Sequence, residues 1–329
     1  MSDILDLNNI PKNVLTTDLS SFNFLLYSLP GMGKTTFAVE TFDSERTLLL
    51  AFEMGAKGIP GARPVPIPDY VTFLKYVDQL DTDEIRAKYD TLIIDTVSRA
   101  SEYIESYILS MYGKNTIGEC GSHGKAYTLI NRFWGLAMNR LKARGYNFVY
   151  IAHANEEVLK NSNGEEIGKY YTPKLSSRVA GLVEPEVDYT FLITLNQAGE
   201  RILVTDNTVK CKGKQRTPLP TIMKLDSELF KEEFIKGIKS KSNGEVINER
   251  TVTTVVEMAN KERDYKELIE EIKSLGNALQ EQGKGKEAIQ IVNSLLGQDD
   301  NGIQRTLDIM TQDNIQVLEV ILMDLKKLN

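Results

Sequence analysis

The sequence predicts an α/β fold: a mostly parallel central sheet flanked by helices, with a small all-helical module at the C-terminal end. Three observations carry this prediction. Short apolar runs alternate with longer helical stretches through the first two thirds of the 329 residues. These runs are continuously apolar rather than alternating, which is typical of strands buried on both faces. After residue 263, apolar residues recur only at helical spacing.

Five apolar runs are the expected strands of the sheet, at residues 22–27, 47–52, 91–95, 148–153 and 189–195. Residues 201–206 and 209–215 are expected to form a hairpin that turns at Asn207.

The chain is expected to have three parts: a core over residues 1–225, a linker or extension over 226–262, and a helical module over 263–329. The polar stretch 239–250 is the expected linker or a mobile hairpin. Asp313 is expected to cap the last helix. The module's apolar stripes suit a helical core, with a partner groove or an oligomer contact as alternatives. They lie at 265–279, 288–295 and 315–328.

Composition excludes several classes of protein. Hydrophobic residues make up 41% of the chain, enough for a sizeable core, but no run reaches the roughly 18 apolar residues of a membrane span. The N-terminal residues resemble no secretory signal, so we expect a cytoplasmic protein without membrane association. Two cysteines and two histidines argue against a disulfide framework and a histidine metal site. The net charge of −7 argues against a uniformly basic surface, but residues 201–225 hold six basic side chains and one acidic.

Residues 28–36, SLPGMGKTT, follow an expected strand and precede a helical run. Gly33, Lys34 and Thr35 fill the second half of the phosphate-binding pattern G-x-x-x-x-G-K-[ST], and Ser28 stands at its first glycine. We expect Lys34 to reach the β- and γ-phosphates of ATP and the Thr35 hydroxyl to bind Mg²⁺. A turn that merely caps a helix is the alternative. The expected nucleotide-binding residues are Pro30, Gly31, Met32, Gly33, Lys34, Thr35 and Thr36.

Polar residues at three strand ends complete this expected site. Asp95 ends the run TLIID, where a carboxylate can hold the magnesium shell. Glu53 follows the second run and is a candidate general base for the attacking water, or a surface residue that starts a loop. His153 ends the run FVYIAH and can sense the γ-phosphate or relay a proton, or serve as a structural histidine.

These segments together resemble the RecA-like P-loop ATPases. They are most similar to phage-encoded, AAA-type nucleotide-binding proteins, some of which act as single-strand annealing proteins in recombination. The resemblance covers residues 20–220 and implies a RecA-like ATPase core. It rests on LLYSLPGMGKTTFA, LLLAFEMGAKGIPGA, YDTLIIDTVS, FVYIAHANEE, VDYTFLITL and KCKGKQRTPLP.

The resemblance implies a role for four residues. Glu53 matches the catalytic base, and His153 matches the residue that senses the γ-phosphate. Lys214 and Arg216 resemble the K-x-R element that reaches a neighbouring subunit's nucleotide and neutralises transition-state charge in trans. A solvated basic hairpin end is the alternative for that pair. With Lys34, these are the expected catalytic residues.

Two polar segments, 111–126 and 154–178, are expected to be loops that face single-stranded DNA, as the resemblance implies. Their cations can follow phosphates while tyrosines stack on bases. Four glutamates in the second segment weaken the positive field, and an ordinary flexible loop is the alternative. The expected nucleic-acid contacts are Lys114, Lys125, Lys169, Tyr170, Tyr171, Lys174 and Arg178.

The expected function is that of a DNA-stimulated, Mg²⁺-dependent ATPase that binds single-stranded DNA and promotes annealing or recombination, encoded by a phage and working in the host cytoplasm. Its expected partners are further copies of itself, in a ring or filament with shared active sites, and a single-stranded DNA-binding protein. The leading alternative is a nucleotide-gated DNA- or protein-binding module with little ATP turnover. A small-molecule kinase and a helicase or packaging motor are less well matched, since no arginine-rich lid or translocation motif is recognised.

Overall fold

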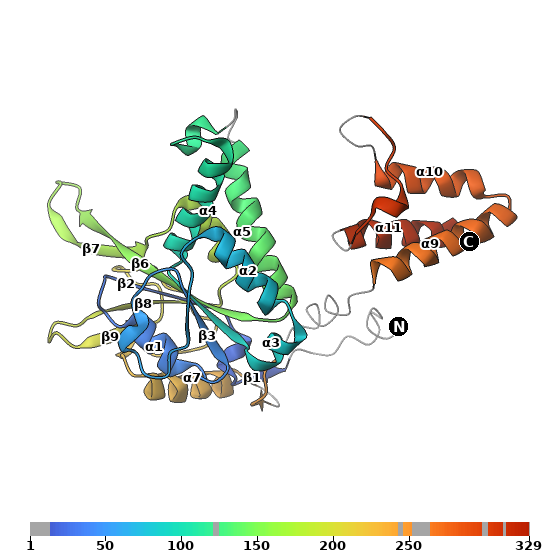
Figure 1. Ribbon diagram of the computed structural model, residues 1–329. Coiled ribbons are helices and arrows are strands. Elements are labelled where there is room, and N and C mark those ends of the chain that lie inside the picture. Colours follow the sequence, from blue (N-terminus) through green and yellow to red (C-terminus); the bar gives the residue numbers. More distant parts are fainter. Residues whose placement is uncertain are drawn as a thin grey trace. The chain divides into compact units, whose positions relative to one another are not determined.

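The computed structural model describes residues 14–120, 125–242, 246–251, 264–297, 302–311 and 314–328. The chain divides into two compact units, Met1–Met258 and Ala259–Asn329, and Figure 1 labels most of the helices and strands in each. Within the described residues, no helix is both long and apolar enough to cross a membrane.

The first unit is built on a nine-stranded sheet in the order β10-β9-β8-β2-β6-β5-β3-β4, with β7 paired to β6. The strands from β8 to β4 are parallel, whereas β9, β10 and β7 pair antiparallel. The strands are β2 Phe24–Ser28, β3 Thr47–Ala51, β4 Pro64–Pro66, β5 Thr91–Asp95, β6 Asn147–Lys160, β7 Glu166–Pro173, β8 Tyr189–Leu195, β9 Arg201–Val204 and β10 Ile222–Lys224. All five predicted runs are therefore strands of one sheet.

Helices cover both faces of this sheet. In β2, Leu25 and Tyr27 face one apolar core, and Phe24 and Leu26 face the other, because successive side chains of a strand point to opposite faces. The first core is closed by α2, α4, α5 and α6, and the second by α1 and α7. These helices, with the short α3, are α1 Lys34–Thr41, α2 Tyr70–Leu80, α3 Asp83–Lys88, α4 Val97–Tyr112, α5 Lys125–Ala143, α6 Ser177–Val183 and α7 Ser227–Lys241. The predicted parallel sheet between helices is confirmed.

The structure differs from the sequence prediction after residue 225. The segment 226–262, expected as a linker or extension, includes α7, whose Phe230, Phe234 and Ile238 are buried in the second core. The polar stretch 239–250 includes β11 (Val246–Ile247), which pairs in parallel with β1 (Leu15–Thr16). These apolar helix residues recur at i, i+4 and i+8, a spacing that places them on one face.

The hairpin predicted around Asn207 is wrong, because residues 209–215 form no strand. Instead, β9 pairs with β8 on one side and β10 on the other. The side chain of Asn207 accepts a hydrogen bond from the amide of Gly213, and a Cβ on Gly213 would lie 2.3 Å from the Asp206 carbonyl carbon. The chain therefore closes a compact turn that a strand could not make.

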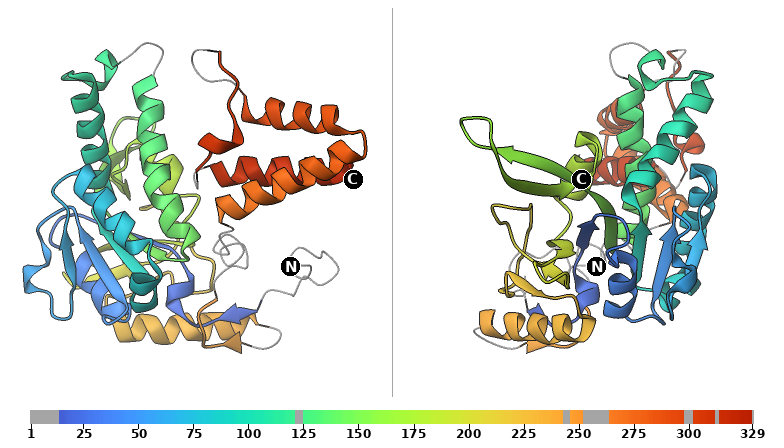
Figure 2. Two further views of the ribbon diagram at one scale, coloured as in Figure 1. Left: turned by 45° about the vertical axis from the view of Figure 1, so that its right-hand side comes forward. Right: turned by 90° about the vertical axis from the view of Figure 1, so that its left-hand side faces the viewer.

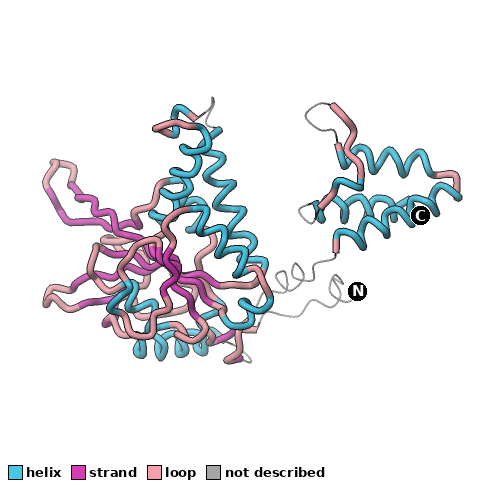
Figure 3. The backbone as a smooth tube through the Cα atoms, in the orientation of Figure 1, coloured by secondary structure: helices cyan, strands magenta, loops and turns pink. Residues whose placement is uncertain are grey.

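The prediction of a polar loop over 154–178 is also wrong. β6 continues to Lys160 and returns as β7, so the segment forms a long β-hairpin that projects from the sheet (Figures 2 and 3). We call residues 154–173 the β6–β7 hairpin. Its residues show no regular alternation of polar and apolar side chains, and glutamate, asparagine and glycine are depleted in strands, so the strand signal in the sequence is weak.

The second unit contains α9 (Tyr265–Glu281), α10 (Gly285–Leu296) and α11 (Ile315–Leu328). Buried leucines and isoleucines of the predicted stripes, among them Leu268, Ile272 and Leu322, form its apolar core. The predicted helical module is confirmed, and packing is the role the structure shows for its stripes. Asp313, the predicted cap of the last helix, lies outside the described residues.

Replacing Gly237 in α7 with alanine is expected to destabilise the first unit by about 1–3 kcal/mol. A Cβ there would lie 2.3 Å from the Pro218 carbonyl oxygen and 2.6 Å from Thr217 Cγ2, so the helix must shift. Gly135→Ala in α5 is the matched control, since its Cβ would meet nothing closer than 3.8 Å and helix propensity favours alanine by about 1 kcal/mol. Urea unfolding followed by Trp134 fluorescence measures both, and equal stability of the two variants would contradict the prediction.

Candidate nucleotide-binding site

The loop between β2 and α1 lies at the carboxyl edge of the parallel strands, where ligands of open α/β sheets bind. Gly31 and Gly33 have φ angles of +75° and +94°, a left-handed conformation that disfavours other residues. Gly33 is the N-cap of α1 and provides no capping side chain. The amides of the first helical turn are therefore free of a side-chain cap and suited to an anion.

Lys34 lies buried beneath this loop. Its Nζ donates to the Ser28 carbonyl oxygen at 3.3 Å, to Ser28 Oγ at 3.1 Å and to the Leu29 carbonyl oxygen at 3.3 Å. Burial lowers the pKa of Lys34, while the carboxylates of Asp95 and Glu53 act in the opposite direction. Ser28, which replaces the first glycine of the pattern, thus supplies two of the three acceptors that position the amine.

Thr35 and Asp95 form the oxygen pair expected to hold Mg²⁺. Thr35 Oγ1 donates to Asp95 Oδ2 at 2.7 Å, and Asp95 is only 7% exposed. Burial raises the pKa of Asp95 above its ordinary value, and the Glu53 carboxylate adds to this, whereas the Thr35 hydrogen bond opposes it. Asp95 has no ion pair among the described residues. A buried carboxylate beside a hydroxyl fits Mg²⁺, which uses one or two protein oxygens together with phosphate oxygens.

Three strand ends bring the remaining polar groups to this edge. Thr96 Oγ1 donates to Glu53 Oε1 at 2.7 Å, and His153 Nε2 lies 3.4 Å from Glu53 Oε2. The Glu53 and His153 side chains are 39% and 31% exposed, so solvent reaches both. Thr96, the N-cap of α4, is not among the residues predicted from the sequence. The signal that could have pointed to it is its position directly after Asp95. The carboxylate is held in a defined position beside the loop and Asp95.

Residues 21–217 match the model of the AAA domain family. The chain belongs to this family of P-loop NTPases. The chain is also 26% identical to the SPbeta prophage-derived uncharacterized protein YorG of Bacillus subtilis (strain 168). The match covers 98% of each protein. A crystal structure of the RadB recombinase matches 61% of this chain and 86% of its own, with 10% identity and a TM-score of 0.33.

The structure does not bring Lys214 and Arg216 to the P-loop of their own AAA domain. Lys214 Nζ donates to the carbonyl oxygens of Glu184 and Val187, and burial lowers the pKa of Lys214. Arg216 Nε lies 2.8 Å from Asp188 Oδ1. Both cations are thus engaged within their own chain.

The candidate DNA contacts are scattered over several elements of the AAA domain. Lys169, Tyr170 and Tyr171 lie on β7, and Lys174 follows it. Arg178 lies in α6, and Lys114 is exposed after α4. Lys125 begins α5, but its side chain is outside the described residues.

Several of these side chains already have partners. Lys169 Nζ lies 2.7 Å from Glu156 Oε1, and the Tyr171 hydroxyl donates to Glu156 Oε2 at 2.8 Å. The Arg178 guanidinium lies 3.6 Å from the centre of the Tyr127 ring. Among the candidate DNA contacts whose side chains the structure describes, only those of the β6–β7 hairpin combine basic and aromatic residues on one element.

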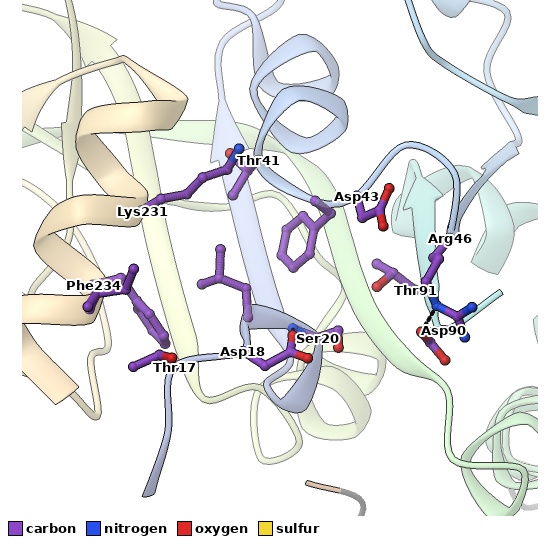
Figure 4. Close-up of a pocket in the computed structure, with 13 residues that line it drawn as sticks. Thr17, Asp18, Ser20, Thr41, Asp43, Arg46, Asp90, Thr91, Lys231 and Phe234 are labelled. Atoms are coloured by element: carbon purple, nitrogen blue, oxygen red, sulfur yellow. Dashed lines mark hydrogen bonds and ion pairs between the residues drawn. The ribbon is translucent and has the colours of Figure 1, made fainter. Parts of the chain in front are cut away.

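A pocket of about 480 Å³ lies at the opposite edge of the sheet, where β3 and β5 begin (Figure 4). Thr41, the last residue of α1, lines it, about 12 Å along the helix from the loop. Its cations are paired: Arg46 with Asp90, and Lys231 with Glu228. This pocket is not the nucleotide site, because it offers neither the glycine loop nor an unpaired cation.

Arg201, at the start of β9, lies beside the P-loop and was not singled out in the sequence. Its Nη2 is 3.5 Å from the Gly31 carbonyl oxygen. The only sequence signal was its membership of the basic strip 201–225.

Proposed function

We propose that this protein hydrolyses ATP with Mg²⁺, binds single-stranded DNA and promotes annealing or recombination in phage DNA metabolism. The observation that carries the proposal is the position of Glu53, held by Thr96 and His153 at the same sheet edge as Lys34 and Asp95. The prophage origin of the similar B. subtilis protein supports the phage setting, with the bacterial cytoplasm as the proposed location.

Each residue of the site has a distinct part in the proposed reaction. Lys34 and the loop amides would bind the β- and γ-phosphates. Thr35 and Asp95 would hold Mg²⁺, which when bound neutralises charge on the phosphate oxygens. Glu53 would accept a proton from the attacking water, and Thr96 keeps one of its oxygens fixed. His153 positions the other oxygen.

The base of the β6–β7 hairpin adjoins this site, which supports control of DNA binding by the nucleotide. His153 is the last β6 residue before the hairpin, and its carbonyl oxygen accepts from the Lys174 amide at 2.7 Å. Ser98 Oγ, in the first turn of α4, donates to the Lys174 carbonyl oxygen at 2.8 Å. A shift of Glu53 and His153 on nucleotide binding would therefore reach the hairpin through a few contacts.

A second connection runs from the P-loop strand. Tyr27, the residue before Ser28, is fully buried, and its hydroxyl contacts the carbonyl oxygens of Tyr171 and Lys212. The Tyr171 amide donates to the Lys210 carbonyl oxygen at 2.8 Å. The P-loop strand, the hairpin base and the turn at 208–214 are thus joined by hydrogen bonds.

DNA binding is proposed on the hairpin, with Tyr170 and Tyr171 stacking on bases and Lys169 pairing with phosphate. The carboxylates of the hairpin oppose a polyanion, so stacking is the larger proposed contribution. Self-association in a ring or filament, with a single-stranded DNA-binding protein as a further partner, completes the proposal. Sharing of active sites would require Arg216 to leave Asp188.

The alternative function is a nucleotide-gated DNA- or protein-binding module with little turnover. It is favoured by one observation: Lys214 and Arg216, the cations proposed to act in trans, have hydrogen-bond and ion-pair partners within their own chain. In that case, ATP would control DNA or protein binding at the hairpin without being consumed.

The proposal is tested by ATP hydrolysis with and without a single-stranded oligonucleotide, over a range of protein concentrations. We expect the oligonucleotide to stimulate hydrolysis, and the stimulation to rise with protein concentration. Replacing both Tyr170 and Tyr171 with alanine should weaken oligonucleotide binding by about 10-fold or more, because stacking contributes about 1–3 kcal/mol per base. The double phenylalanine variant keeps the rings and should bind normally.

An ATP hydrolysis rate per subunit that changes neither with added oligonucleotide nor with protein concentration would exclude the recombination role. Unchanged oligonucleotide binding by the double alanine variant would exclude the hairpin as the DNA site.

A further inference from the structure

Arg201 begins β9, and its guanidinium contacts the P-loop. Its Nη2 lies 3.5 Å from the Gly31 carbonyl oxygen, and a Cβ built on Gly33 would lie 3.5 Å from its Nη1. Gly31 and Gly33 are the two glycines whose left-handed conformation shapes the loop. The arginine therefore contacts the part of the chain that would surround the phosphates.

The backbone of Arg201 is held on both sides. It pairs with Leu195 of β8, and its carbonyl oxygen accepts from the Leu225 amide at 3.0 Å. The Leu225 side chain would in turn lie 3.8 Å from a Cβ on Gly33. The side chain is exposed, but the strand that carries it is fixed relative to the loop.

The charge of Arg201 is uncompensated, unlike that of most cations in the strip 201–225. Lys212 pairs with Glu184 at 2.7 Å and Arg216 with Asp188 at 2.8 Å. Within the described part of the chain, Arg201 has no carboxylate within 4 Å. Among the described residues, its one side-chain hydrogen bond is the long contact to Gly31, although a guanidinium carries five N–H donors. These donors stand next to a loop built for an anion.

We propose that Arg201 binds the phosphate chain of a nucleoside di- or triphosphate in cis, that is, from the same chain as the P-loop. Guanidinium and phosphate match in charge and in hydrogen-bond geometry, so a charge-assisted contact replaces the weak one to Gly31. Arg201 thereby contributes to nucleotide affinity in the single subunit, a role that Lys214 and Arg216 cannot fill from their present positions. The inference rests on nucleotide binding at the P-loop.

The test is a titration of the protein with fluorescently labelled ADP and ATP in the presence of Mg²⁺. Arg201→Ala should weaken binding of both nucleotides about 10-fold, and Arg201→Lys should restore part of the affinity. Lys210→Ala is the matched control, because it removes another exposed cation of the same strip and should leave affinity unchanged. The loss should be the same at all protein concentrations, as expected for a contact in cis. Thermal unfolding without nucleotide checks that the variants fold.

The outcomes separate this inference from the proposed function. Normal binding by Arg201→Ala, together with loss of binding in Lys34→Ala, would overturn the role of Arg201 and leave the P-loop site intact. An affinity loss that appears only at high protein concentration would place the contact in trans and also overturn it. Absence of nucleotide binding by the unaltered protein would overturn the proposed function itself.

Discussion

Glu53→Gln is expected to lower the rate of ATP hydrolysis by about 10²- to 10⁴-fold while leaving ATP binding nearly unchanged. Glutamine has almost the same shape and can still accept the hydrogen bond from Thr96, but it cannot take a proton from water. Thr96 contacts Oε1 of Glu53 and His153 contacts Oε2, and both neighbours can still contact a glutamine side chain at this position. Steady-state hydrolysis and nucleotide titration measure the two quantities separately.

Glu84→Gln is the control for this prediction, since Glu84 is an exposed residue of α3 that pairs only with Lys88 among the described residues. Hydrolysis by Glu53→Gln at the normal rate would remove Glu53 as the base. Oligonucleotide binding distinguishes the two proposed functions: an ATP-driven protein loses annealing activity in this variant, whereas a nucleotide-gated module stays bound to DNA with ATP present.

Lys34→Ala is expected to weaken ATP binding by about 10- to 100-fold, because hydrogen bonds to charged groups contribute about 1.5–3 kcal/mol. The amine is held beneath the loop by Ser28 and Leu29, so its position is set before the nucleotide binds. Mg²⁺–ATP should raise the unfolding temperature of the unaltered protein and have little effect on the variant, because only a bound ligand shifts the unfolding equilibrium.

Lys88→Ala, at an exposed position of α3, controls for loss of a lysine as such. An equal stabilisation by ATP in the Lys34 variant and the unaltered protein would mean that the nucleotide binds elsewhere. The apo stability of Lys34→Ala is measured as well, because the change removes the Lys34 hydrogen bonds to both Ser28 oxygens, whereas the Leu29 carbonyl oxygen still accepts from Ser28 Oγ at 2.7 Å.

Much of the nucleotide site could be predicted from the sequence because its central part is contiguous. The run from Phe24 to Thr41 is a strand, a glycine-containing turn and a helix. The strand follows from its continuous apolar residues, the turn from its left-handed glycines, and the helix from the buried residues Phe37, Ala38 and Thr41 at helical spacing. Asp95 was predictable for a related reason, since it directly ends a buried strand.

The β6–β7 hairpin and the roles of Lys214 and Arg216 were not predictable in this way. Strand pairing between Ala154 and Pro173 depends on a partner segment, and the charges on both strands resemble those of a solvated loop. The K-x-R string is compatible with a role in a neighbouring subunit. In the folded chain, however, Lys214 donates to the carbonyl oxygens of Glu184 and Val187, and Arg216 pairs with the Asp188 carboxylate.

The sequence by itself determined the sheet strands, the strand–loop–helix segment that carries Lys34 and Thr35, the place of Asp95 at a strand end, and the helical nature of the C-terminal unit. All of these follow from neighbouring residues. Only the tertiary structure decided that Thr96 and His153 hold Glu53 and that Arg201 lies against the P-loop. Those contacts join ends of strands far apart in the chain, and they form because the order β9-β8-β2-β6-β5-β3 places these ends at one edge of a sheet buried on both faces.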